Sequence, residues 1–133
     1  MSEFKLKIIH PKGVYFEGDV QIVNVRTTVG QMGILAHMLP FAGTLEISQM
    51  NFVEKGERKH YFVSGGFIYV KKDEVTIITD AIESPEEIDL NRAQKAKQRA
   101  EQRIASKNSE IDMVRAELAL KRAITRIGVK SNH

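Results

Sequence analysis

Cysteine is absent from this 133-residue chain, and histidine is scarce. Without cysteine the chain has no disulfide framework, no thiolate nucleophile and no zinc site with thiolate ligands. No two histidines have the spacing of three to five residues that a metal site on one helix requires. We therefore expect no metal site and place the histidines at the surface or in turns. They are His10, His37, His60 and His133.

Long hydrophobic runs are also missing. No stretch approaches the roughly 18 apolar residues that a membrane-spanning helix requires, and the charged, alternating residues 1–7 do not form a secretory signal. We expect no direct membrane insertion and a place in the cytoplasm. The catalytic motif G-x-S-x-G and the phosphate loop G-x-x-x-x-G-K-[ST] are absent too, so we expect no catalytic residues and no enzymatic activity of the chain's own.

Charge is divided unevenly along the chain. Residues 1–85 carry nine Lys and Arg against ten Asp and Glu, whereas residues 86–133 carry eleven against seven. This basic tail raises the possibility of a nucleic-acid-binding module. The tail has no Phe, Tyr or Trp to stack on bases, and acids interrupt its basic residues. We therefore expect no nucleic acid among the partners.

Up to about residue 82, the apolar residues follow a period near two. Phe4, Leu6 and Ile8 alternate with charged residues, which is typical of a strand with one buried face. Turn-forming segments recur at short intervals, as in a sandwich or barrel. The alternation changes phase within residues 20–25, which predicts a β-bulge there. The turn-forming segments are residues 11–13, 30–33, 54–57, 65–66 and 71–74.

The pattern changes abruptly at Ser84, which can cap the first amides of a helix. Pro85 supplies a preset φ, and Glu87 completes a capping box. From there to about residue 127 the chain has neither glycine nor proline, and a second capping box at residues 109–112 divides the stretch into two helices. The predicted fold is an all-β N-terminal sandwich over residues 1–84, followed by a C-terminal two-helix hairpin over residues 85–133.

The facing sides of the two predicted helices are mostly alanine. Alanine permits close approach but buries much less surface than leucine, whose full burial contributes about 1.5–3 kcal/mol. The hairpin is therefore expected to be marginally stable, although an ordinary hairpin that never opens has the same composition. The facing residues are Ala93, Ala96, Ala100 and Ile104 on the first helix, and Ala116, Leu120, Ala123 and Ile127 on the second.

Each predicted helix also presents a pair of arginines on one face. Arg92 and Arg99 are seven residues apart, and Arg122 and Arg126 are four apart. If the helices fold together, these four like charges converge at a cost, unless an anion lies between them. Guanidinium groups suit phosphate because their planar donors bind oxygens bidentately. The alternative is a solvated basic face without a ligand.

Several short motifs, in this order, resemble those of the ε subunits of bacterial F-type ATP synthases. A glycine loop, a double-glycine strand start, an I-D-x-x-R-A motif and a second-helix motif together cover nearly the whole chain. The chain departs from the family pattern at residues 36–40, where the usual P-G-H-x-P is replaced, and at Tyr69, where a glutamate is common. The motifs are Gly30–Leu35 with Pro40, Ser64–Phe67, Ile88–Ala93 and Arg115–Ala123.

The resemblance implies a non-catalytic central-stalk subunit on the cytoplasmic face of the bacterial plasma membrane. It implies the γ subunit, the membrane c-ring and the α and β subunits as partners. The sandwich would couple γ to the ring, and the extended helices would meet acidic loops of the β subunits and restrain ATP hydrolysis. Stand-alone nucleotide sensing is the alternative function.

The resemblance also implies ATP as a regulatory ligand, with no catalytic cofactor. Four arginines would hold the phosphates and ribose, and four further residues would line the adenine. The same charges would serve the β subunits when the helices extend, since one charge set can meet two anionic partners in two conformations. The implied ATP site comprises Arg92, Arg99, Arg122 and Arg126, with Glu83, Ile88, Asp89 and Ala93.

Overall fold

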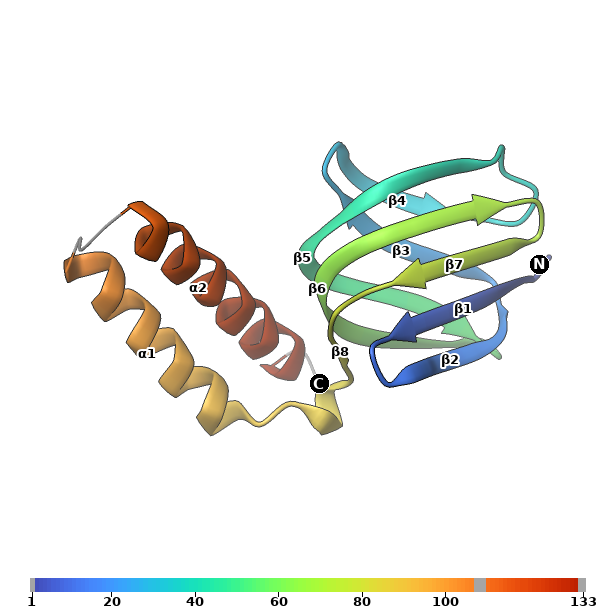
Figure 1. The fold of residues 1–133 in the computed structure, drawn as a ribbon. Coiled ribbons are helices and arrows are strands. Elements are labelled where there is room, and N and C mark those ends of the chain that lie inside the picture. Colours follow the sequence, from blue (N-terminus) through green and yellow to red (C-terminus); the bar gives the residue numbers. More distant parts are fainter. Residues whose placement is uncertain (1, 107–109, 132–133) are drawn as a thin grey trace. The chain divides into compact units, whose positions relative to one another are not determined.

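The computed structural model describes residues 2–106 and 110–131. The chain divides into two compact units, Met1–Glu83 and Ser84–His133. The first unit is all-β and the second is helical, so the predicted fold class is confirmed (Figure 1). Within the described ranges, no helix has both the length and the apolar character needed to cross a bilayer.

The strands of the first unit form one continuous hydrogen-bonded sheet that curls into a sandwich (Figure 1). The strand order is β2-β1-β7-β6-β5-β3-β4, with β8 paired to β6. Only the pairing of β1 with β7 is parallel among the described strands. The strands are β1 (Phe4–His10), β2 (Gly13–Val20), β3 (Ile22–Thr27), β4 (Gly30–Ile34), β5 (Phe41–Glu54), β6 (Glu57–Lys71), β7 (Glu74–Ile78) and β8 (Ile82–Glu83).

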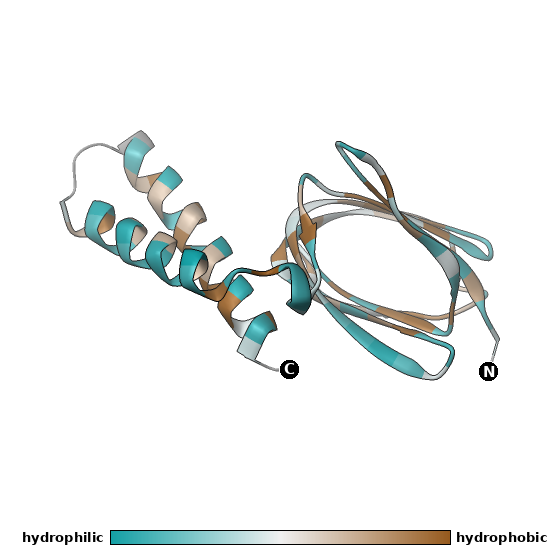
Figure 2. Ribbon diagram, turned by 90° about the horizontal axis from the view of Figure 1, so that it is seen from below, coloured by the Kyte–Doolittle hydropathy of each residue, from teal (hydrophilic) through white to brown (hydrophobic). Residues whose placement is uncertain are grey.

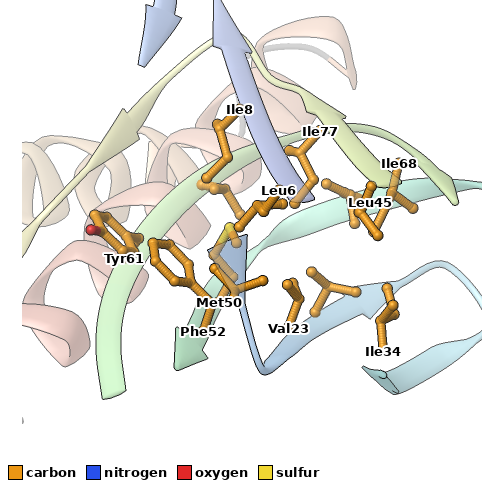
Figure 3. Close-up of a cluster of buried hydrophobic side chains, with 14 of the residues drawn as sticks. Leu6, Ile8, Val23, Ile34, Leu45, Met50, Phe52, Tyr61, Ile68 and Ile77 are labelled. Atoms are coloured by element: carbon orange, nitrogen blue, oxygen red, sulfur yellow. The ribbon is translucent and has the colours of Figure 1, made fainter. Parts of the chain in front are cut away.

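Alternation along the strands builds the core between the two layers. Figure 2 shows hydrophobic and hydrophilic residues following one another along the strands, as a sheet with one buried face requires. The interior side chains come from strands far apart in the sequence and meet in one cluster (Figure 3). Within it the rings of Phe52 and Tyr61 stack with centroids 5.2 Å apart. Other members include Leu6, Ile8, Val23, Ile34, Leu45, Met50, Ile68 and Ile77.

The phase change within residues 20–25 coincides with a bend at Gln21 between β2 and β3, and the pairing of β3 with β5 also shifts register between Asn24 and Thr27. Two of the predicted turns are wrong. Residues 30–33 lie in β4, and the pair Gly65 and Gly66 lies inside the long strand β6. Both glycines have positive φ, which lets β6 change direction while it continues to pair with β5.

The second unit starts at a single 3-10 turn, η1 (Pro85–Glu87), followed by α1 (Leu90–Ser106) and α2 (Glu110–Ser131). The predicted capping box is present at Ser84 and Glu87, but it caps η1 and not a long helix. Ile88 then adopts an extended conformation, so α1 begins only at Leu90. The second predicted box includes Ser109, which lies outside the described residues.

Candidate functional site

Asp89 determines where α1 begins. Its Oδ1 accepts a hydrogen bond from the backbone N–H of Arg92 at 3.1 Å, and its backbone carbonyl accepts the N–H of Ala93 at 3.0 Å. This is the arrangement of an N-cap residue, which satisfies amides that have no partner within the helix. The I-D-x-x-R-A motif thus contains a helix start, with Ile88 buried just before it.

The two helices lie antiparallel to one another (Figure 1), and a seam of alanines joins them. The same spacing of seven residues separates the two fully packed alanines on each helix. Their side chains retain only 1–4% of their exposure, whereas Ile104, Leu120 and Ile127 are half-buried. The helices therefore approach closely while burying little apolar surface. The buried seam residues are Ala93, Ala100, Ala116 and Ala123.

Arginines gather on one flank of this seam. Each of the four buried alanines directly follows an arginine, which points about 100° to the same side of its helix. In an antiparallel pair this side is the same flank for both helices. An arginine three residues after a seam alanine points about 60° to that side as well, which adds two more. The basic flank, as we call it, consists of Arg92, Arg99, Arg103, Arg115, Arg122 and Arg126.

The acidic residues of the helices are distributed differently. Glu101 and Glu117 directly follow seam alanines and therefore point to the opposite flank. Asp112 is the exception, because its position four residues before Ala116 places it on the basic flank. The hairpin thus has one strongly cationic side, on which an anion would meet guanidinium groups from both helices.

Three of the four predicted arginines lie near the open end of the hairpin, where α1 starts and α2 ends. Arg92 lies in the first turn of α1, and Arg122 and Arg126 lie in the last three turns of α2. Arg99 lies two turns further along the same flank. Arg92 and Arg99 are exposed, whereas Arg122 and Arg126 are half-buried beside the seam.

The residues assigned to the adenine are placed less favourably. Ile88 and Ala93 keep only 3% and 4% of their exposure, so they offer little surface to a ligand in this conformation. Asp89 is engaged in capping α1. Glu83 ends β8, opposite Phe62, and belongs to the sandwich unit.

A second candidate surface, on the sandwich, was not predicted. Phe67, Tyr69 and Ile78 are 51%, 42% and 41% exposed. Phe67 pairs with Ile78 across β6 and β7, and Tyr69 lies two residues along β6, so all three share the outer face of the sheet. The segment Phe67–Val70 is apolar at every position, and this signal could have indicated that β6 is apolar on its outer face as well as on its inner face. We call these three residues the outer apolar patch.

The loop between β4 and β5 is also apolar and exposed. Leu39 is 86% and Leu35 47% exposed. His37 has a positive φ of 66°, and its Nδ1 lies 3.2 Å from Oδ1 of Asp73 in the turn between β6 and β7. This contact ties the loop to that turn and leaves its leucines facing solvent.

Two family models match the chain in succession. The first describes the β-sandwich domain of the ATP synthase delta/epsilon chain and matches residues 3–85. The second describes the long α-helix domain of the same chain and matches residues 86–131.

Similar proteins and structures agree with these models. The ATP synthase epsilon chain of Shouchella clausii is 43% identical over 108 residues, which cover 81% of each chain. That of Clostridium novyi is 46% identical over 106 residues, 79% of this chain and 81% of the relative. In fold, the chain resembles one in the Euglena gracilis mitochondrial ATP synthase, with a TM-score of 0.86, 24% identity and coverage of 100% of this chain and 83% of that one.

Proposed function

The chain belongs to the ATP synthase delta/epsilon chain family, and on this basis we propose that it is the ε subunit in the central stalk of a rotary F-type ATP synthase. It couples the γ subunit to the membrane c-ring through the sandwich and restrains ATP hydrolysis through the helical hairpin. Its place is the cytoplasmic face of the bacterial plasma membrane, as a peripheral subunit.

The observation that carries the regulatory part is the pairing of a thin alanine seam with a basic flank. The buried contact consists of four alanines, with Ile88 and Val129 buried at the open end, while guanidinium groups from both helices repel one another beside it. The repulsion between these arginines destabilises the closed hairpin, and a bound anion reduces that repulsion. An anion bound to the closed hairpin stabilises it, and acidic loops of the β subunits favour the extended helices.

The sandwich supplies the contacts to the stalk and the ring. An exposed apolar patch on a sheet face is a feature of protein–protein contact surfaces. We assign the outer apolar patch to the γ subunit and the loop containing Leu35 and Leu39 to the c-ring. The α and β subunits meet the hairpin when it extends.

ATP is the proposed anion for the closed hairpin. Arg92, Arg122 and Arg126 hold its phosphates and ribose at the open end, with Arg99 further along the flank. The residues proposed for the adenine are Glu83, Ile88, Asp89 and Ala93, of which Ile88 and Ala93 would have to become accessible because both are buried. The nucleotide is bound there and not hydrolysed, since the residues assigned to its phosphates are all arginines, which provide neither a nucleophile nor a general base.

Removal of the hairpin tests the proposed function. A chain that ends after Glu83 keeps every strand of the sheet, so it should fold, assemble with γ and the ring, and preserve proton coupling. The reconstituted enzyme should hydrolyse ATP faster than the enzyme with the full chain. Failure of the shortened chain to assemble, or an unchanged hydrolysis rate, would show that the hairpin is not the inhibitory element.

A further inference from the structure

The seam of α2 continues past its two buried alanines to a lysine. Ala116, Ala123 and Lys130 follow one another at intervals of seven residues, so all three lie on the side of α2 that faces α1. At the level of Lys130 the first helix has not yet begun, because α1 starts at Leu90. The Nζ of Lys130 instead donates a hydrogen bond to the backbone carbonyl of Pro85 in η1, at 2.8 Å.

The acceptor of this hydrogen bond is held firmly in place. Pro85 has a fixed φ, it is buried, and the capping box between Ser84 and Glu87 closes the turn around it. The same carbonyl also accepts the backbone N–H of Ile88 at 3.3 Å. A preorganised acceptor costs little entropy when the lysine reaches it.

We propose that Lys130 and Pro85 form a clasp that keeps the hairpin closed and thereby sets the balance between its closed and open forms. The hydrogen bond links residues 45 positions apart. It joins the end of α2 to the turn before α1, at the end of the hairpin where no loop connects the two helices. The second helix cannot leave the first without breaking it. The regulatory consequence rests on the proposed function, in which the open hairpin is inhibitory.

The clasp matters because the seam between α1 and α2 is thin. A hydrogen bond from a charged donor is stronger than one between neutral groups, and the buried residues of the seam are alanines, with Ile88 and Val129 buried near the clasp. Lys130 is half-buried, so part of its ammonium is withdrawn from solvent. Its loss should therefore shift the opening equilibrium by a measurable factor.

Hydrogen–deuterium exchange of the full-length chain without nucleotide tests the clasp. Lys130→Met keeps the aliphatic stem and removes the donor. Amides of residues 112–131 should then exchange about five- to tenfold faster, which is less than the full effect of a charged hydrogen bond because Lys130 is only half-buried. Lys130→Arg, which restores a donor, should return the rate toward that of the parent. Sandwich peptides serve as the internal standard and should be unaffected.

Lys95→Met is the matched control, because Lys95 is exposed on the outer side of α1. It should exchange within twofold of the parent. The clasp is wrong if Lys130→Met also stays within twofold of the parent, or if Lys95→Met accelerates exchange equally. An ATP titration of the parent separates the two proposals. Faster exchange of Lys130→Met without ATP binding by the parent would support the clasp and contradict the nucleotide function. ATP binding by the parent with unchanged exchange of Lys130→Met would contradict the clasp and support the nucleotide function.

Discussion

The carboxylate of Asp89 accepts a hydrogen bond from the backbone N–H of Arg92 at the first turn of α1. Asp89 is one of the residues proposed for the adenine, and it also starts the helix that carries Arg92 and Arg99, two of the arginines proposed for the phosphates. Any effect of Asp89 on nucleotide binding has to be separated from its effect on the helix.

Substitution at Asp89 can make this separation. Asp89→Ala removes the cap and should lower the stability of the helical unit by about 1 kcal/mol. Asp89→Asn keeps a capping oxygen and should leave the stability within a few tenths of a kcal/mol of the parent, while it removes the charge. Helix content measured by circular dichroism during thermal unfolding, together with ATP calorimetry, distinguishes the two roles. Equal stability of Asp89→Ala and the parent would show that the cap is unimportant.

The capping residues illustrate how far the sequence could predict the helical unit. The two helices and the four buried seam alanines were predicted correctly from spacing alone. The start of α1 was not, because Ser84 and Asp89 are both good caps and the sequence does not show which one precedes the long helix. The structure uses both, with Ser84 on η1 and Asp89 on α1.

Long-range placement was harder to predict than local structure. Pairs of arginines within each helix were recognised, but Arg103 and Arg115 were not, because their common flank depends on the antiparallel packing of two helices. The recurring Arg-Ala dipeptide is the signal that could have found Arg115. Gly65 and Gly66 were assigned to a turn because glycine pairs commonly form turns, whereas here the long-range pairing with β5 keeps them within a strand.

Gly66 should be among the most sensitive positions of the sandwich. A Cβ added there would lie 2.0 Å from the carbonyl oxygen of Ile78, and its φ is +128°. Gly66→Ala should therefore lower the free energy of unfolding by at least about 3 kcal/mol. Gly30→Ala is the control, since Gly30 has a φ of +125° but nothing within 4 Å of an added Cβ. It should cost only about 1–2 kcal/mol in urea denaturation, and equal losses would contradict the predicted clash.

The outer apolar patch should matter for binding and not for folding. Phe67→Ser and Ile78→Thr change exposed side chains on the outer face, so thermal stability should change by less than about 1 kcal/mol. Affinity for the γ subunit, measured by surface plasmon resonance, should fall at least about tenfold, as expected for an apolar anchor of an interface. Gln49→Ser is an exposed control on β5. Unchanged γ affinity in both patch variants would exclude this face.

The ion pair between Lys59 and Glu54 should stabilise the sandwich, and this contribution should be lost at alkaline pH. Their Nζ and Oε1 are 2.9 Å apart, and the hydrogen bond to Glu54 raises the pKa of Lys59 above 10.5. A raised lysine pKa stabilises the fold below the unfolded pKa, and this contribution is lost as pH rises through the folded pKa. Lys59→Met should cost less than about 1 kcal/mol at pH 8, because solvent screens the pair. The difference from the parent should shrink above about pH 10.5 in chemical denaturation, and a constant difference would contradict the assignment.

The arginines at the open end should control the response to ATP. A ligand that binds only the closed hairpin stabilises it by about 2.7 kcal/mol at a hundredfold excess over Kd. That is enough to move a marginal equilibrium. Reversal of a 1:99 population requires about 5.5 kcal/mol, so inhibition should decline gradually as ATP rises. The hydrolysis rate of the reconstituted enzyme, measured against ATP concentration, tests this graded response.

Arg92→Ala and Arg126→Ala should each weaken ATP binding by about 1.5–3 kcal/mol, the contribution of a charged hydrogen bond. This corresponds to about a 10- to 150-fold rise in Kd, measured by calorimetry of the isolated chain. Arg103→Ala is the sharpest control, because Arg103 lies on the same basic flank but in the last turn of α1, away from the open end. Its Kd should change less than about threefold, since only long-range charge is lost. Equal losses of affinity in all three variants would indicate a diffuse electrostatic effect. If the parent shows no heat of ATP binding at millimolar nucleotide, the arginines act only in the extended state of the helices.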